Sequence, residues 1–162
     1  MKKERRRAKW VGPEYGIRVS FQVPLDFAFA WCTDFTSEDP KLERATYKRK
    51  IVERTPGHVV FEDLEETKDG WNWSRNAVTF RPPNRWHMDG FGNHRDMTAD
   101  YLLTSLSDGR TQLDLRFRRQ PKDASVTKLR KAQREADSVR AWKQFALVME
   151  KDYKRSKRRR GN

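Results

Sequence analysis

Asp63 and Arg75 form the pair of residues in this sequence best suited to polar chemistry inside a cavity. Each lies six residues from Asp69, and the dipeptide Asp69-Gly70 is typical of a tight hairpin turn. Antiparallel strands on either side of that turn would bring the two side chains opposite each other. Such a pair orients a polar ligand group, and Arg alone clamps a carboxylate. If either strand turned its opposite face to the cavity, these side chains would face water. They would then form an exposed salt bridge worth about 0–1 kcal/mol.

The other chemically versatile residues give weaker signals. The three histidines lack the paired spacing of zinc ligands, and Cys32 has no cysteine partner, so we predict neither a metal nor a cofactor. The chain contains no G-x-G-x-x-G or Walker loop and no nucleophile elbow. General acid–base catalysis by Asp63, His87 or Tyr101 remains an alternative that no paired spacing supports.

An amphipathic strand and a short helical pair are expected at the start of the domain. Residues 16–23 alternate apolar and polar side chains, the period of a half-buried strand. Pro24 follows at a position where a helix can begin. Phe27, Ala30 and Trp31 then share one helical face, and residues 36–42 are a loop or a second short turn.

Six further strands, joined by short turns, are expected between residues 45 and 119. Their predicted ranges are 47–54, 58–66, 71–80, 85–91, 97–106 and 111–119. Short connections predict an antiparallel meander. The clean alternation of 111–119 indicates one covered face and one face in water. In 71–80 the inner face is ambiguous, because Trp71 and Trp73 compete with Val78 and Phe80 for it.

A single long helix is expected at the end of the chain. Residues 123–154 contain no Gly or Pro and carry apolar residues at helical spacing. The predicted buried positions are Leu129, Ala132, Ala136, Val139, Trp142, Phe145, Ala146, Met149 and Tyr153. The residues at the N-terminal end of this list are small and those at the C-terminal end are bulky. We therefore expect the helix to pack closely on the sheet at its N-terminal end and to leave a wider gap at its C-terminal end.

Composition and charge favour one globular domain with basic ends. The 162 residues carry a net charge of +13, yet residues 1–9 hold six Lys or Arg and residues 151–162 hold seven. We predict disordered basic tails at 1–10 and 155–162 around a domain at 11–154. No run of 18 apolar residues and no apolar stretch after the basic start exist, so we expect neither a membrane span nor a secretory signal. The lone Cys32 fits a reducing compartment, and the expected location is cytoplasmic.

This order of elements resembles the START-like superfamily. The local match is residues 16–39, GIRVSFQVPLDFAFAWCTDFTSED, where members often have an alternating strand, a Pro or Ala step and a short helix before an acidic loop. The resemblance spans about residues 16–154. It implies an α+β helix-grip fold, a curved antiparallel sheet of about seven strands wrapped around a long C-terminal helix, as in birch pollen allergens, polyketide cyclases and coenzyme-Q-binding proteins. The superfamily has no universal catalytic motif, so the fold does not assign chemistry.

The resemblance also implies a cavity between the concave sheet face and the helix. With strand parity taken from the clearest strands, its predicted ligand-binding residues are Asp63, Trp73, Arg75, Trp86, Met88, Tyr101, Leu103, Trp142, Phe145 and Met149. Aromatic walls with a few polar groups are typical of small-molecule pockets. The alternative is that these rings fill a closed core.

Three functions fit these observations. The first is binding of a small hydrophobic or amphipathic molecule of lipid, quinone or polyketide type. The second is an interaction protein whose basic tails contact nucleic acid, the ribosome or an acidic partner, with binding that falls steeply with salt. The third is a polyketide cyclase or dehydratase, which requires positioned acid and base groups.

Overall fold

A seven-stranded antiparallel sheet dominates the fold. The computed structural model describes residues 10, 12–122 and 130–161. The strands are β1 (Tyr15–Phe21), β2 (Lys48–Arg54), β3 (His58–Thr67), β4 (Gly70–Arg81), β5 (Arg85–Gly92), β6 (Arg95–Ser105) and β7 (Thr111–Pro121). Their order across the sheet is β1-β7-β6-β5-β4-β3-β2. The first strand therefore closes against the last, and the other six form the expected meander.

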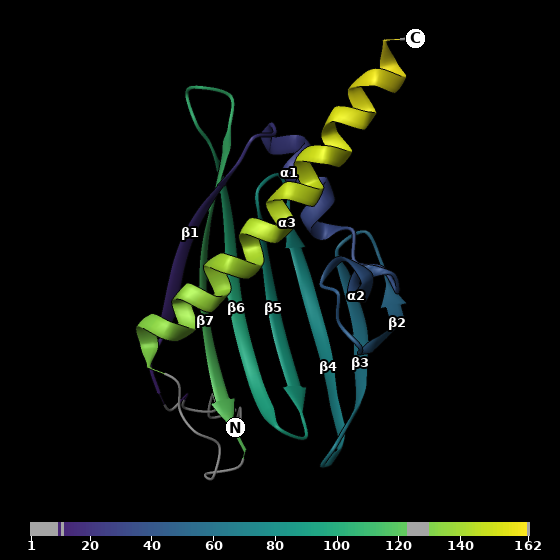
Figure 1. Cartoon of the computed structure of the whole chain (residues 1–162), viewed down its shortest axis with the longest axis vertical. Coiled ribbons are helices and arrows are strands. Elements are labelled where there is room, and N and C mark those ends of the chain that lie inside the picture. The colour runs from purple at the N-terminus through teal and green to yellow at the C-terminus, as the bar shows by residue number, and fades with distance from the viewer. Residues whose placement is uncertain (1–9, 11, 123–129, 162) are drawn as a thin grey trace, which may run out of the picture.

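Three helices lie on one side of this sheet. They are α1 (Leu25–Thr33), α2 (Asp39–Leu42) and α3 (Lys131–Arg160). Figure 1 shows α3 crossing the inner face of the curved sheet diagonally, with α1 beside it, α2 farther across the sheet near β2 and β3, and the C-terminal end of α3 extending past the sheet. Of the three, α3 contacts β1, α1 contacts β6 and α3, and α2 contacts β2. This arrangement is the helix-grip architecture that the order of elements predicts.

The core follows from the alternation of apolar residues in the strands. Ile17, Val19 and Phe21 of β1 are buried while the residues between them are exposed. In β7, Leu113 and Leu115 are buried with the same period of two. Such alternation places one face of the sheet against α3 and leaves the other in water. The helix contributes Ala146 and Met149, of which Met149 is fully buried.

The N-terminal part of α3 differs from the expectation. The predicted start at residue 123 and the predicted buried Leu129 lie outside the described residues, and the described helix begins at Lys131. Ala132 and Ala136 are exposed, so the prediction that they are buried against the sheet is wrong. Val139, Trp142, Ala146, Met149 and Tyr153 do pack on the core, whereas Phe145 lines the cavity. Side chains in the middle of α3 therefore attach it to the core.

The C-terminal end of α3 also differs from the expectation. The helix continues to Arg160, so the predicted disordered tail at 155–162 is wrong for residues 155–160. Lys and Arg are good helix formers, and cations in the last turn interact favourably with the helix dipole. These effects are consistent with a helix that persists beyond the sheet. None of the helices in the described part of the chain is long and apolar enough to cross a membrane.

The hairpin between β3 and β4 turns at the expected place. Thr67 pairs with Gly70, and Gly70 has a φ of 118°, a conformation that glycine adopts without steric cost. The Asp-Gly prediction for the turn is confirmed. The centre of the hairpin, however, lies between Lys68 and Asp69, which changes the partners along both strands.

Candidate functional site

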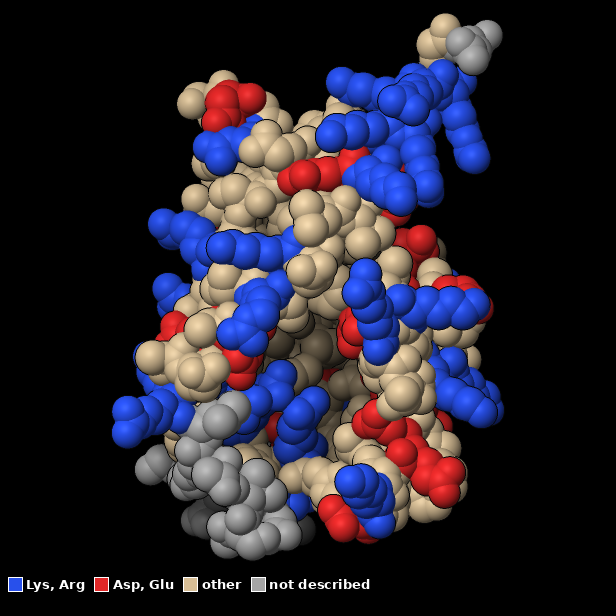
Figure 2. All heavy atoms as spheres, viewed as in Figure 1, with Lys and Arg blue, Asp and Glu red and all other residues tan. Residues whose placement is uncertain are grey.

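A cavity of about 1030 Å³ lies between the inner face of the sheet and the helices. Figure 2 shows its opening as a hollow beneath α3, with Lys and Arg side chains at its lower edge. Strands β2 to β7 supply the floor and one wall, while α1, the segment around α2 and the middle of α3 supply the rest. The curvature of the sheet and the length of α3 together leave this volume unfilled.

Aromatic side chains form the deepest wall of the cavity. The rings of Trp86 and Tyr101 are stacked with centroids 4.7 Å apart and planes 9° apart. Tyr101 approaches Trp142 of α3 at 6.1 Å, and Trp142 contacts Phe145 edge to face at 5.3 Å. Aromatic pairs at such separations stabilise one another beyond their buried area. The rings thus link the sheet to α3 and present a continuous apolar surface to the cavity.

Most of the predicted cavity residues lie around this space. Those lining the cavity are Asp63, Trp73, Trp86, Met88, Tyr101, Trp142 and Phe145. The side chains of Leu103 and Met149 are fully buried in the core instead, because they lie where α3 packs directly on the sheet. Trp73 borders the cavity, but its ring packs edge to face on Phe91 of the neighbouring strand, with centroids 5.6 Å apart. The roles of the predicted cavity residues in binding a ligand remain predictions.

The predicted pairing of Asp63 with Arg75 is wrong. Asp63 lies opposite Ser74, and Arg75 lies opposite Glu62, to which its Nε donates a hydrogen bond of 2.9 Å. A shift of one residue in register moves a side chain to the other face of a sheet. Arg75 is thereby placed on the outer face in a half-exposed ion pair and does not line the cavity.

Asp63 pairs with Arg49 of β2, a residue that the sequence analysis did not select. The Nε and Nη2 atoms of Arg49 donate to the two carboxylate oxygens of Asp63 at 2.8 and 2.9 Å, and Nη1 donates to Asp39 at 2.7 Å. The guanidinium also lies 3.9 Å from the centroid of the Phe61 ring. Burial opposes the charge, but the hydrogen bonds and charge of Asp63 outweigh it and raise the pKa of Arg49. The one available signal was the alternation of Tyr47, Arg49 and Ile51.

The hydroxyl and thiol groups at the cavity remain protonated at neutral pH. Burial raises the pKa of the Cys32 thiol and that of the Tyr101 phenol well above their usual values. Desolvation, followed by the charge of Glu43, also raises the pKa of Tyr47. Desolvation raises the pKa of Glu43 itself, partly offset by its side-chain hydrogen bond with Tyr47. The phenols of Tyr47 and Tyr101 can donate hydrogen bonds to a ligand, and Cys32 is not a thiolate nucleophile.

His87, an alternative acid–base residue, lies away from the cavity. Its Nδ1 is 2.7 Å from Asp100 and its Nε2 is 3.0 Å from Asp89, on the outer face of the sheet. Burial opposes protonation, but the hydrogen bonds with Asp100 and Asp89 outweigh it and raise the pKa of His87. The described residues contain no cluster of three or more His, Cys, Asp or Glu that could hold a metal ion.

Two arginines, Arg95 of β6 and Arg119 of β7, line the opposite side of the cavity from Arg49. Their positions in the sequence give no signal for this role, because each stands near the end of a strand, where charged residues are common. The buried Asn76 lies between these basic groups on the sheet and donates to Ser74 Oγ at 3.2 Å. The cavity therefore combines an aromatic wall with two separate polar ends.

Known structures share this fold, although no protein-family model and no curated protein matches the sequence. A START superfamily protein from Mycobacterium smegmatis matches with a TM-score of 0.64 and 13% identity, over 89% of this chain and 99% of that one. The ZhuI aromatase/cyclase from Streptomyces sp. R1128 matches at 0.62 and 15%, over 88% and 94%. The protein TTHA0849 from Thermus thermophilus matches at 0.65 and 10%, over 86% and 95%. The chain has the START-like helix-grip fold.

Proposed function

We propose that this domain binds a small amphipathic molecule, of polyketide, quinone or lipid type, in the cavity beneath α3. The observation that carries the proposal is the unfilled volume of about 1030 Å³ at the centre of the fold. Ligand pockets typically measure about 300–1,000 Å³ and combine apolar walls with a few polar groups. Rings that filled a closed core would leave no comparable volume, so the unfilled cavity favours binding over simple core packing.

The aromatic wall favours a ligand that contains rings or a flat apolar body. Trp86 and Tyr101 present stacked rings, and Trp142 approaches them from α3. Such surfaces bind planar groups through stacking and burial of apolar area. The likeness to an aromatase/cyclase supports an aromatic polyketide among the candidate ligands.

Binding accounts for the cavity chemistry better than catalysis does. Asp63 is engaged by Arg49 through two hydrogen bonds, and the phenol of Tyr101 has a raised pKa. A cyclase or dehydratase needs a base whose pKa lies near the working pH and that reaches the substrate. The groups named here are either neutral donors or carboxylates that already have partners, which suits orientation of a ligand.

Fluorescence titration with N-phenyl-1-naphthylamine, a neutral dye that brightens in apolar sites, tests the proposal. The wild-type chain should bind the dye. Ser138→Trp from α3 and Met97→Trp from the sheet, both at cavity-lining positions, should each reduce the affinity by about tenfold or more. Thr104→Trp, at an exposed position of the same strand as Met97, is the matched control. Equal dye binding by all four proteins would refute the cavity as the site.

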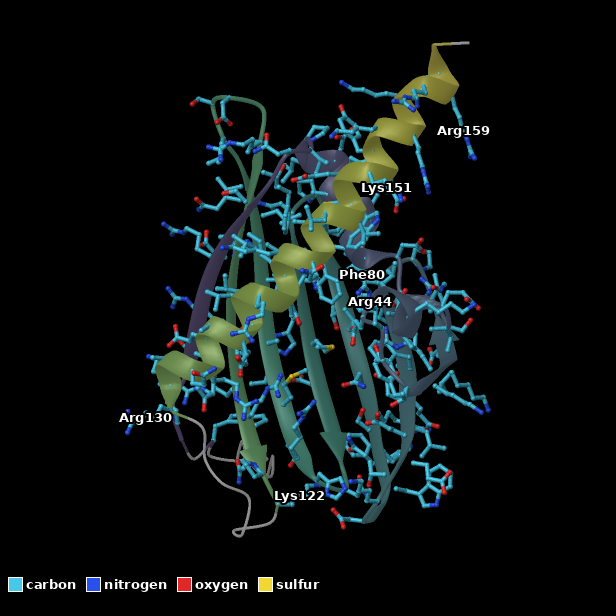
Figure 3. All side chains as sticks on the ribbon, in the orientation of Figure 1. Arg44, Phe80, Lys122, Arg130, Lys151 and Arg159 are labelled. Atoms are coloured by element: carbon cyan, nitrogen blue, oxygen red, sulfur yellow. The ribbon has the colours of Figure 1, made fainter. Side chains whose placement is uncertain are left out.

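The basic end of α3 supports a second candidate function, contact with a nucleic acid. Residues 154–160 include Lys154, Arg155, Lys157 and three consecutive arginines on a helix that extends past the sheet. Figure 3 labels Arg159 on this projecting end. Phosphate contacts of this kind lower the logarithm of the binding constant by about 0.7 per contact for each unit of log salt on single strands. Deletion of residues 155–162 should abolish the salt-dependent binding of nucleic acid. Unchanged binding would refute this second candidate function.

A further inference from the structure

Two arginines, Arg95 and Arg119, line the end of the cavity where β7 ends and α3 begins, and Arg134 is close enough for its charge to act on both. On β6 and β7, Met97 pairs with Arg119, so Arg95 is the diagonal neighbour of Arg119 on the same inner face. Arg134 comes from the first turn of α3, which starts at Lys131. Figure 3 marks this end of the molecule by the labelled Lys122 and Arg130.

Within the described residues, these three arginines have no ion-pair partner. None of the salt bridges among described residues includes Arg95, Arg119 or Arg134. The Nε atoms of Arg119 and Arg134 are buried and have no hydrogen-bond partner among the residues that the structure describes. Arg119 instead lies 5.6 Å from the centroid of the Phe117 ring. Buried charged groups are normally paired, because an unpaired one loses hydration without compensation.

The positive charges act on one another. Desolvation, followed by the charges of Arg95 and Arg134, lowers the pKa of Arg119 to about 10. Desolvation and the charge of Arg134 also lower the pKa of Arg95. All three nonetheless stay charged at neutral pH. Arg49, on the other side of the cavity, differs from these three arginines because it has Asp63 and Asp39 at 2.8 and 2.7 Å.

From this geometry we infer that the ligand is an amphipathic anion whose carboxylate or phosphate group binds between Arg95, Arg119 and Arg134. The inference rests on the proposed function and specifies its ligand class. Guanidinium groups bind both kinds of oxyanion through paired, charge-assisted hydrogen bonds. The apolar body of the ligand then lies along the wall formed by Trp86, Tyr101 and Trp142, which belongs to the same cavity.

A matched pair of dyes separates the anionic group from the apolar body. 1-Anilinonaphthalene-8-sulfonate carries a sulfonate, and N-phenyl-1-naphthylamine has the same rings without it. The wild-type chain should bind the anionic dye about tenfold or more tightly than the neutral one. Arg119→Gln should remove that preference and leave the affinity for the neutral dye unchanged, while Arg119→Lys should retain part of it. Arg116→Gln, on the same strand but with a largely exposed side chain, is the control for charge alone.

The outcomes distinguish the two proposals. If the neutral dye binds and Ser138→Trp blocks it, but Arg119→Gln and Arg116→Gln affect the anionic dye equally, the anion site is refuted and the cavity proposal stands. If Ser138→Trp changes the affinity of neither dye, both proposals are refuted. Displacement of the anionic dye by 1-naphthoic acid or by 1-naphthyl phosphate identifies the preferred oxyanion, with 1-methylnaphthalene as the neutral competitor. Failure of both acids to compete better than the hydrocarbon would also refute the anion site.

The melting temperature of the ligand-free chain provides a second readout. Because Arg119 has no counter-charge in the described part of the chain, Arg119→Gln should leave the melting temperature equal or raise it. Arg95→Gln should behave in the same way, which keeps the test valid if one variant folds poorly. A large decrease in both, together with unchanged preference for the anionic dye, would assign the arginines a purely structural role.

Discussion

Arg49 holds both carboxylate oxygens of Asp63, at 2.8 and 2.9 Å, and reaches Asp39 of α2 at 2.7 Å with its remaining nitrogen. One guanidinium thereby joins β2, β3 and the segment that covers the cavity. Its side chain is only 8% exposed. The pair that the sequence suggested, Asp63 with Arg75, would have lain between β3 and β4 and would not have connected the sheet to α2.

Arg49→Met should destabilise the domain by about 3 kcal/mol, because it leaves two carboxylates half-buried and without a counter-charge. The free energy of unfolding in urea measures the effect. Arg75→Met is the matched control, since its ion pair with Glu62 is 43% exposed on the Arg side and should contribute about 0–1 kcal/mol. Equal destabilisation by the two variants would contradict the role given to Arg49.

The difference between the predicted and observed partners of Asp63 has a local cause. The Asp69-Gly70 dipeptide indicated where the chain turns. It did not indicate whether the centre of the hairpin lies at Asp69 or between Lys68 and Asp69, half a residue earlier. Because side chains alternate, that half-residue decides which face Arg75 occupies. Trp71 and Trp73 added to the ambiguity, since large apolar residues suggest an inner face. Trp73 instead packs on Phe91, which is 50% exposed.

The fold itself was predictable because several local signals agree. Strict alternation in β1 and β7, the turn residues between the strands and the absence of Gly and Pro from residues 123–154 all point to one sheet with one long helix. The arginines of the cavity were not predictable. Arg95 and Arg119 are distant in sequence, and Arg134 lies on a helix whose exposed face is also rich in charge. Only the pairing of β6 with β7 and the position of α3 bring them together.

Met149→Ala should destabilise the domain by about 2–5 kcal/mol, because it removes a fully buried side chain between α3 and the sheet. Leu147 lies two residues earlier in the helix and is 61% exposed. Leu147→Ala should therefore change stability by less than about 1 kcal/mol. Urea unfolding of both variants measures the difference. If the two substitutions had equal effects, α3 could not be packed as described.

His87 should make stability depend on pH. Its pKa is raised in the folded state by Asp100 and Asp89 against the opposing effect of burial, so the folded state binds the proton more tightly than the unfolded state. The resulting stabilisation is fully present below the unfolded pKa of about 6.5. It is lost as the pH rises from there through the higher folded pKa.

The measurement is the free energy of unfolding at several values from about pH 5.5 to 8.5, a range around the ordinary histidine pKa, for the wild type and for His87→Asn. The difference between the two proteins should shrink as the pH rises. A second histidine, His58, which lies 2.9 Å from Glu53, is present in both proteins and cancels. A difference that stays constant with pH would show that His87 is not stabilised by its charge.

The tryptophan indole groups offer the most direct test of the central claim, that a ligand occupies the space between the sheet and α3. Trp86 and Trp142 line the cavity, while Trp71 is 56% exposed and does not. Nitrogen–proton NMR spectra, assigned by single Trp→Phe variants, should be recorded during titration with N-phenyl-1-naphthylamine. A ligand in the cavity should shift the indole signals of Trp86 and Trp142 in a saturable way and leave that of Trp71 unchanged. Shifts confined to Trp71, with the signals of Trp86 and Trp142 unmoved at saturation, would contradict it.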